Sequence, residues 1–281
     1  YPDRSDAQVT AGSTTSITHL NSDGFTIGSS DGSVNADGDT YVGWCWDAGT
    51  AAATASTDGT ITPTAQWVNA TAGFSMGTYT GTGAAGTIGH GLGAKPEFII
   101  TKNSGGTASW YVYLRDETDA LVLDTDAATD DSAGYWNDTA PTNTVFTVGP
   151  GSSTSDNTQT FIYYAWTGIP GFSRFGTYKG NGQASGPAIT CGFRPKLVIY
   201  KRINSSREWM MIDSERGTFN GRMPFLYADL NNAEGESSDH RHYLKSNGFQ
   251  LKTTHNSANA NGDTYIYAAW AEHPFKTARA R

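Results

Sequence analysis

The sequence predicts an all-β protein built from tandem antiparallel β-sandwich modules, with a jelly-roll-like arrangement as the more specific form. Three observations support this prediction. Apolar runs have the length of strands, clusters of Gly, Asn, Asp, Ser and Thr separate them, and a pattern repeats after about 100 residues. Glycine supplies 33 of the 281 residues, well above the roughly 7% average of soluble proteins. Helical periodicity is almost absent, which disfavours helical and mixed folds.

One kind of repeated segment, which we call the A half, is marked by a Gly-Thr-Tyr motif. Residues 77–83 return 99 positions later as residues 176–182. The same offset, without a gap, relates Trp110 to Trp209. Because turn residues and large apolar residues coincide at one offset, the repeat reflects a repeated supersecondary unit.

A second kind of segment, the B half, alternates with the first. Residues 20–46 return 224 positions later as residues 244–270, and a weaker copy lies at residues 146–166. The order along the chain is therefore B-A-B-A-B. We expect two complete A-B modules, preceded by a B half whose A half lies upstream or in a partner chain.

The repeats divide the chain into five predicted parts. The connector after the first B half is rich in Ala, Thr and Gly and has little apolar content, which is typical of a linker or an exposed loop. The parts are an orphan half-module forming a β-hairpin at 1–47, the linker at 48–72, sandwich modules at 73–166 and 171–272, and a C-terminal tail at 273–281.

Within the A halves, two kinds of strand are expected. Residues 98–100 and 197–200 are continuous apolar runs shortly after a proline, which indicates strands buried on both faces. Residues 110–115 alternate with a period of two, as in a half-buried strand. Residues 121–123 add one more short strand.

Each B half is expected to be a β-hairpin. In the first copy a strand starts at Gly24, residues 35–38 form a turn that tolerates positive φ, and residues 41–46 form the return strand. The one stretch with helical character, residues 231–241, is short and polar, and a loop is the alternative.

Charge and composition exclude several classes of function. The formal net charge of −8 provides no basic surface for phosphates, so no nucleic acid is expected as a partner. No apolar run approaches the length of a membrane span, so no membrane insertion is expected. Two cysteines, Cys45 and Cys191, form neither a disulfide framework nor a zinc motif.

Two catalytic-looking strings fail in their own context. Residues 73–77 match G-x-S-x-G, a pattern that requires a strand, a sharp turn and a helix. Their repeat copy, residues 171–175, lacks the final glycine, and no helix is expected after either copy. Residues 81–86 match G-x-G-x-x-G but lead into a strand, whereas a dinucleotide site needs a helix. The sequence therefore predicts no enzyme, no catalytic residues and no cofactor.

Few residues are candidates for ligand binding. Sugar faces stack on Trp and Tyr rings, and most aromatic residues recur between modules, which indicates structural positions. Tyr135, Trp136 and Trp67 are the aromatic residues expected at the surface, as a glycan platform, with a structural role as the alternative. His240 and His242 alternate on a predicted strand and are the candidate metal ligands, although exposed polar residues without a metal are favoured.

Motifs over nearly the whole chain resemble a repeat family of tail-fibre-like virion proteins of marine bacteriophages. Each motif alone is a turn and a strand, whereas their order and spacing are specific. They lie at residues 135–142, 178–182, 192–195, 244–249, 261–267 and 271–276.

The resemblance implies a non-enzymatic structural protein of the extracellular virion, in a tail fibre or receptor-binding module that contacts the host cell. The implied partners are further copies of the chain in a homotrimer, other virion proteins, and a glycan or envelope protein of the host surface. Two alternatives remain: a capsid decoration or fibre-shaft module without ligand, and a carbohydrate-binding module of a secreted bacterial protein.

Overall fold

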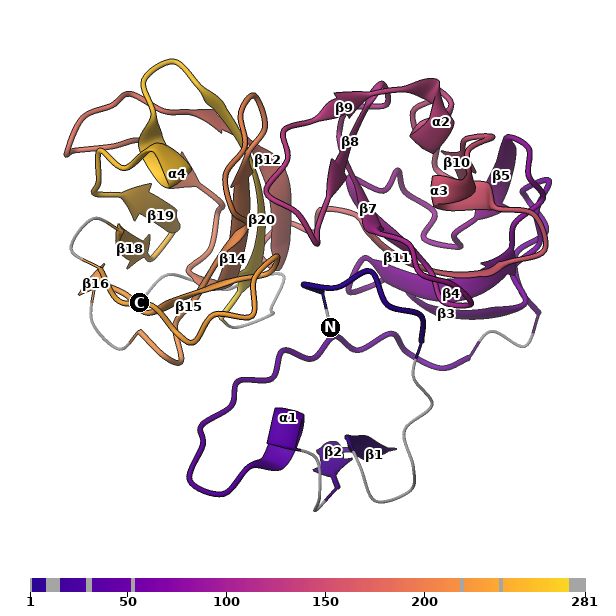
Figure 1. Ribbon diagram of the computed structural model, residues 1–281, viewed down its shortest axis with the longest axis horizontal. Helices are drawn as coiled ribbons and strands as arrows, with labels where there is room; N and C mark the ends of the chain where they lie inside the picture. The colour runs from indigo at the N-terminus through magenta and orange to yellow at the C-terminus, as the bar shows by residue number, and fades with distance from the viewer. Residues whose placement is uncertain are drawn as a thin grey trace. The chain divides into compact units, whose positions relative to one another are not determined.

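The computed structural model describes residues 2–8, 16–28, 32–51, 54–217, 220–237 and 240–272. The predicted tail at 273–281 lies outside the described residues. The chain forms two units, one of residues 1–6 with 47–281 and one of residues 7–46. β-strands are the main regular structure of the described residues and pair in antiparallel sheets, which confirms the predicted fold class (Figure 1). The helices are single turns: α1 (Gly32–Asn35), α2 (Ala133–Trp136), α3 (Ser152–Ser155) and α4 (Asn256–Asn259).

None of these helices is long or apolar enough to cross a membrane, within the part of the chain that the structure describes. The predicted helical character of residues 231–241 is absent from the described part of that stretch, which is largely irregular. Its polar side chains offer no apolar stripe for a helix to bury.

Module 1 contains one large and one small antiparallel sheet. The large sheet has the order β3-β4-β11-β6-β7-β8-β9, and the small sheet pairs β5 with β10. The strands are β3 (Ala65–Asn69), β4 (Phe74–Thr80), β5 (Gly86–Gly89), β6 (Phe98–Asn103), β7 (Trp110–Leu114), β8 (Asp119–Val122), β9 (Asp130–Asp131), β10 (Val145–Val148) and β11 (Thr160–Trp166).

Module 2 repeats this plan. Its sheets have the orders β12-β20-β14-β15-β17 and β13-β19-β18-β16. The strands are β12 (Ser173–Lys179), β13 (Ala188–Thr190), β14 (Pro195–Arg202), β15 (Met210–Asp213), β16 (Gly221–Arg222), β17 (Phe225–Tyr227), β18 (Arg241–Lys245), β19 (Gly248–Leu251) and β20 (Thr264–Ala271).

Both modules are folded as rolls. In module 2 the first strand, β12, pairs with the last, β20, and the second, β13, pairs with the last but one, β19. In module 1 β4 pairs with β11, and β5 pairs with β10. A chain wound in this way makes two facing sheets with one core between them, which is the jelly-roll-like sandwich that the sequence predicts.

The prediction that each B half is a hairpin is wrong. β19 lies in the small sheet of module 2 and β20 in the large one, with α4 between them in the chain. β10, α3 and β11 are arranged in the same way in module 1. A turn of Asn, Asp and Gly reverses the chain whether the two strands pair with each other or face each other across a core. The turn residues therefore did not distinguish these arrangements.

The predicted linker at 48–72 is also partly wrong, because it contains the edge strand β3. Ile61 is 7% exposed in the core. Gln66 on β3 is buried, and its Nε2 atom donates to the hydroxyl of Tyr163 at 2.8 Å. An edge strand that buries only one face needs little apolar content, so the composition of this segment concealed it.

The Gly-Thr-Tyr motif of the A halves has a packing explanation. Tyr79 stacks on Phe161 at 5.1 Å, and Tyr178 stacks on Tyr265 at 4.8 Å. Two residues earlier, a Cβ on Gly77 would lie 2.8 Å from the Tyr163 ring. Gly176 has the same relation to a tyrosine of β20. The glycine therefore makes room for a tyrosine of the neighbouring strand, and the tyrosine of the motif packs on another aromatic ring of that strand.

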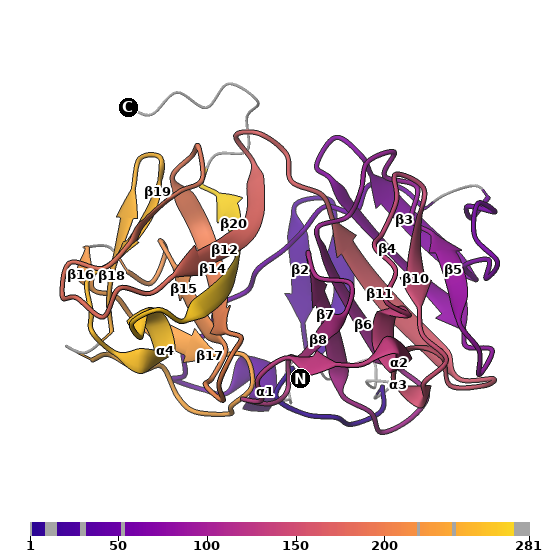
Figure 2. The same cartoon turned by 90° about the horizontal axis from the view of Figure 1, so that it is seen from above.

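The outer faces of the two large sheets pack against each other within this unit (Figure 2). Phe98 lies 5.7 Å from Phe175, and Trp166 lies 5.9 Å from Trp270, measured between ring centroids. All four side chains are at most 5% exposed. The result is four layers of sheet, and the predicted burial of residues 98–100 and 197–200 on both faces follows from it.

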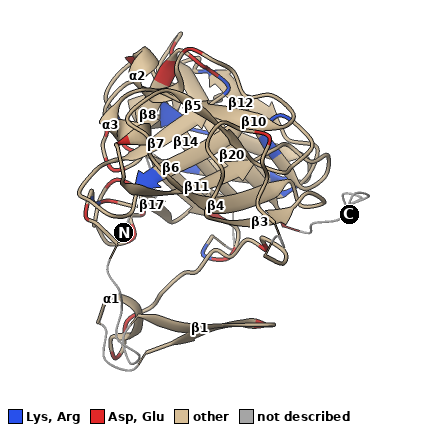
Figure 3. Ribbon diagram, turned by 90° about the vertical axis from the view of Figure 1, so that its right-hand side faces the viewer, with Lys and Arg blue, Asp and Glu red and all other residues tan. Residues whose placement is uncertain are grey.

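Hydrogen bonds extend this contact along the modules. Trp209 donates through Nε1 to the carbonyl of Val122 at 2.9 Å. Lys201 donates through Nζ to the carbonyl of Asp126 at 2.9 Å, and the amide of Thr129 donates to a module 2 carbonyl. Acidic and basic residues are interspersed along the strands and loops of the chain (Figure 3).

The second unit contains the hairpin of β1 (Ile17–Asn21) and β2 (Gly24–Ile27), followed by α1. The predicted return strand at 41–46 is not a strand in the structure. In module 2 the equivalent strand, β20, pairs with β12 and β14. Among the described residues of their unit, residues 41–46 have no equivalents of those two strands.

Candidate ligand-binding pocket at the module junction

A pocket of about 710 Å³ lies where module 1 passes into module 2. Segments from both modules form it: the start of β6, the end of β7, the connection between β11 and β12, and the loop after β13. The lining residues are Lys95, Glu97, Arg115, Gly168, Pro170, Gly171, Ser173, Arg174, Phe175, Cys191 and Gly192.

Glu97 and Arg115 form the polar centre of the pocket. The Oε2 atom of Glu97 lies 2.9 Å from Nη1 of Arg115, and its Oε1 atom accepts the amide of Gly168 at 3.2 Å. Arg115 also donates to the carbonyl of Phe175 in module 2 at 3.2 Å. Its φ of +61° is uncommon for a long side chain, and such backbone is retained where surrounding contacts hold it.

The pocket is positive in a chain that is negative overall. Lys95, Arg115 and Arg174 supply three cationic groups, and Glu97 supplies one carboxylate. Arginine is suited to carboxylate, sulfate and phosphate because its planar donors match two oxygens at once. The arrangement therefore favours a small anionic group, such as the acidic substituent of a sugar.

The thiol in the pocket is not activated. Burial raises the pKa of Cys191 to about 12, although Arg174 nearby acts in the opposite direction. At neutral pH the sulfur is therefore protonated, and a protonated thiol is a poor nucleophile.

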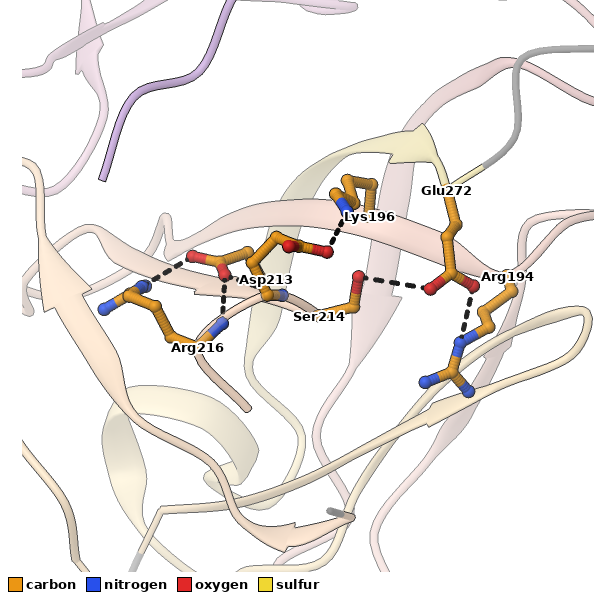
Figure 4. A network of polar contacts seen from close by, with 7 residues as sticks. Arg194, Lys196, Asp213, Ser214, Arg216 and Glu272 are labelled. Atoms are coloured by element: carbon orange, nitrogen blue, oxygen red, sulfur yellow. Dashed lines mark hydrogen bonds and ion pairs between the residues drawn. The ribbon is translucent and has the colours of Figure 1, made fainter. Parts of the chain in front are cut away.

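The corresponding end of module 2 has different chemistry. Lys95, Glu97 and Arg115 match Arg194, Lys196 and Ser214 at the offset of 99. There the charged groups bind one another, as Figure 4 shows. Nε of Arg194 lies 2.8 Å from Glu272, Ser214 also contacts Glu272, and Lys196 pairs with a neighbouring glutamate. Beside them, Arg216 binds the buried carboxylate of Asp213 at 2.7 Å.

Sequence reasoning missed the pocket residues. Charged side chains at strand ends are common on solvated surfaces, so none of them was singled out. One signal was available: within strands that otherwise repeat closely, Glu97 is matched by Lys196 and Arg115 by Ser214. A change of charge inside a repeat marks positions with different surroundings.

The expected glycan platform is not brought together. Trp136 is 1% exposed and packs edge-on against Tyr113 at 5.8 Å, so its expected place at the surface is wrong. The one-turn helix α2 directs this indole into the core. Tyr135 is partly buried, its ring lies tilted against that of Tyr111, and its hydroxyl donates to Asp130 at 2.5 Å. Trp67 is half-buried on β3, which is one edge strand of the large sheet. Tyr135 and Trp136 lie on α2, which contacts β8 near the other edge, so the three rings are not neighbours.

The candidate metal ligands are buried and bonded to protein groups. His242 Nε2 lies 2.6 Å from the hydroxyl of Tyr200. His240 Nε2 lies 2.9 Å from Nδ1 of His255, a residue that the sequence did not single out. The expectation that both are exposed is wrong, because β18 faces the core of module 2. Among the described residues no group of three or more His, Cys, Asp or Glu is placed to hold a metal ion.

Ser75, the serine of the G-x-S-x-G string, lies within β4 and is wholly buried. Its hydroxyl lies 3.3 Å from that of Tyr163. The string is part of a strand, without the sharp turn into a helix that exposes a nucleophile.

These features define a class: a tandem jelly-roll-like β-sandwich protein with a cationic pocket at the junction of its modules. The chain belongs to the family described as "Domain of unknown function (DUF7483)", whose model matches residues 1–274. No curated protein matches the sequence. No solved structure matches it either.

Proposed function

We propose that the chain is a non-enzymatic structural protein of a bacteriophage virion, in a tail fibre or receptor-binding module that contacts the host cell surface. The sheet-to-sheet packing of the two modules is the observation that supports this most. A fibre that transmits contact from its tip to the particle must resist bending between its domains. Buried aromatic packing and partly buried hydrogen bonds join these modules, whereas flexibly linked domains share small polar interfaces.

Host contact is assigned in this proposal to the pocket at the module junction. Bacterial envelopes present acidic sugars and phosphate groups, and Lys95, Arg115 and Arg174 provide matching cations. The other partners in the proposal are further copies of the chain in a homotrimer and other proteins of the virion. Its location is the extracellular particle.

Two measurements test the proposal. Mass spectrometry and antibody-labelled electron microscopy of purified particles from a phage that encodes the chain should locate it on the tail. The purified chain should also bind host cells and compete with particle adsorption. Absence from the particle overturns the virion role. Presence without binding overturns host contact and leaves a shaft or decoration module.

A pair of variants isolates the pocket. Combined Arg115→Ala and Arg174→Ala should weaken binding to the acidic host glycan on the order of 10-fold or more, because charge-assisted contacts are lost. Arg241→Ala is the matched control, since this arginine is exposed on β18, outside the pocket. Equal binding by both variants removes the pocket from the proposal.

A further inference from the structure

The unit of residues 7–46 repeats the B half of module 2 element by element. β1 matches β18, β2 matches β19 and α1 matches α4, with both ends of each element at the offset of 224. Residues 41–46 match most of β20. The unit is therefore half of a sandwich module.

The local bonds of this half-module are those of the complete module. The hydroxyl of Tyr41 donates to the carbonyl of Gly32 at 2.9 Å and accepts the amide of Ala36 at 2.8 Å. Tyr265 makes the equivalent bonds, at 2.6 and 2.8 Å. Gly38 has a φ of +81°, and its counterpart in module 2 has +80°. The half-module thus adopts the conformation of a B half without an A half against it.

Its apolar side chains differ sharply in exposure from their counterparts. In module 2 these side chains form the core, whereas in the half-module they face solvent. Exposure is 83% for Leu20 and 1% for Leu244, 41% for Phe25 and 1% for Phe249, and 49% for Tyr41 and 0% for Tyr265. Exposed apolar side chains gathered in one small unit mark a surface for association.

Module 2 shows what covers such a surface. Its A half supplies β12 and β14 to the two edges of β20 and stacks Tyr178 on Tyr265. Asn259 of α4 donates to Asn181 at 2.9 Å and accepts the backbone amide of the same residue at 2.7 Å. Asn35, the counterpart of Asn259, is present and exposed in the half-module.

We propose that residues 17–28 and 32–46 are an acceptor site for an A-type half-module, which adds strands at both edges of residues 41–46 and completes a third sandwich. Each of the two A halves of this chain is already paired with its own B half. Exchange between copies of the chain cannot supply the missing one, because every copy brings two A halves and three B halves. The A half that fits comes from outside residues 1–281. The inference does not rest on the virion role, because the count of halves alone leads to it.

The natural thiol of Cys45 reports on this site. Cys45 is exposed, and its counterpart in module 2 is Ala269, which is 0% exposed in the core. In the test, a copy of residues 171–240 is fused directly before Ile17 of the chain. Docking of the copy should slow the reaction of Cys45 with a thiol reagent by about 100-fold or more, because reaction then requires the module to open. Cys191, buried in module 2, shows that the original module stays folded.

Within the copy, Cys191→Leu removes the second buried thiol, since module 1 carries Leu92 at the equivalent position. The matched control adds Val198→Asp to the copy. Val198 is 0% exposed in the core of module 2, so a carboxylate there prevents the copy from packing. Cys45 in this control should react as fast as in the natural chain.

A second donor, a copy of the module 1 A half at residues 73–144, guards against misfolding of one fusion. Slow reaction of Cys45 with either donor, together with fast reaction in the Val198→Asp control, supports the acceptor site. Fast reaction with both donors, while the original Cys191 stays protected, overturns it. Slow reaction in the control also overturns it, because the extension would then shield Cys45 without docking.

Discussion

Replacing His242 should change how the stability of module 2 depends on pH. His242 is wholly buried on β18, with Nε2 2.6 Å from the hydroxyl of Tyr200. Burial lowers its pKa to about 3, and the neighbouring His240 acts in the same direction. A histidine in an unfolded chain has a pKa near 6.5, so the two states bind a proton at different pH.

The direction in which the free energy of unfolding changes with pH follows from the order of the two pKa values. As pH falls below about 6.5 the unfolded chain takes up a proton that the folded chain excludes, so the free energy of unfolding decreases. The decrease is about 1.4 kcal/mol per pH unit between pH 6.5 and 3. Between pH 7 and pH 4.5, His242 alone should therefore lower the stability by roughly 2.5 kcal/mol.

Urea titrations at pH 7 and pH 4.5, followed by tryptophan fluorescence, measure this difference. His242→Gln keeps a hydrogen-bonding group beside Tyr200 and does not titrate, so its loss of stability over this interval should be about 2.5 kcal/mol smaller than that of the natural chain. His19→Gln is the control for the substitution itself, because His19 is exposed on β1, outside module 2.

The same loss of stability in His242→Gln and in the natural chain would refute the reasoning. If the variant does not fold, the imidazole signal of His242 in the natural chain provides the measurement by nuclear magnetic resonance. Its chemical shift should stay constant from pH 7 to pH 4.5. A midpoint near pH 6 would show that the ring takes up a proton in the folded state.

Three further predictions concern packing and buried charge. Phe98→Ala should lower the free energy of unfolding by roughly 3 to 5 kcal/mol, whereas Leu230→Ala, at an exposed position, should change it by less than about 0.5 kcal/mol in urea titrations. Burial lowers the pKa of Lys201 to about 8, below the ordinary 10.5. Between pH 8 and pH 10.5 this amine is therefore protonated in the unfolded chain and largely neutral in the folded chain. The natural chain should therefore gain about 1.4 kcal/mol per pH unit relative to Lys201→Met from pH 8 to 10.5, measured by the same titrations. Trp136→Ala should cost roughly 3 to 5 kcal/mol, because the indole is core, and Tyr135→Phe should cost about 1 kcal/mol, the worth of one hydrogen bond, in thermal or urea unfolding. A loss below about 1 kcal/mol for Phe98→Ala or Trp136→Ala, or no pH dependence for Lys201, would contradict the packing described.

The parts of the fold that the sequence predicted correctly are those in which local pattern and tertiary surroundings agree. Residues 98–100 and 197–200 are apolar on both faces because one face meets the core and the other meets the neighbouring module. The repeat of the Gly-Thr-Tyr motif located the A halves, since glycine and tyrosine there share one packing requirement. Such features are visible in a sequence because each residue satisfies a constraint within its own strand.

Pairing between distant strands could not be predicted in the same way. The continuous apolar run of residues 265–270 indicates a buried strand, but not that its neighbours are β12 and β14 instead of β19. His242 was expected at the surface because histidine is polar, and only the other sheet of the module, which contains Tyr200 on β14, shows that the imidazole is bonded in the core. The pocket was missed for the same reason, since its charges come from segments that meet only when two modules pack.

The two equivalent module ends show how one scaffold serves two surroundings. In module 1, Arg115 donates partly to Glu97 and partly to a carbonyl of the next module. These contacts span the junction of the two modules, where the pocket lies. In module 2, Ser214 replaces this arginine, and Arg194 binds Glu272 of its own module. The first end depends on a neighbour to complete its polar contacts, and the second completes them locally. The half-module differs from this ion-paired end in the side chains that it exposes, because Leu20, Phe25 and Tyr41 are apolar or aromatic and their counterparts in module 2 form a core. A further sandwich half therefore fits at the half-module, where a core is missing, more readily than at the ion-paired end of module 2.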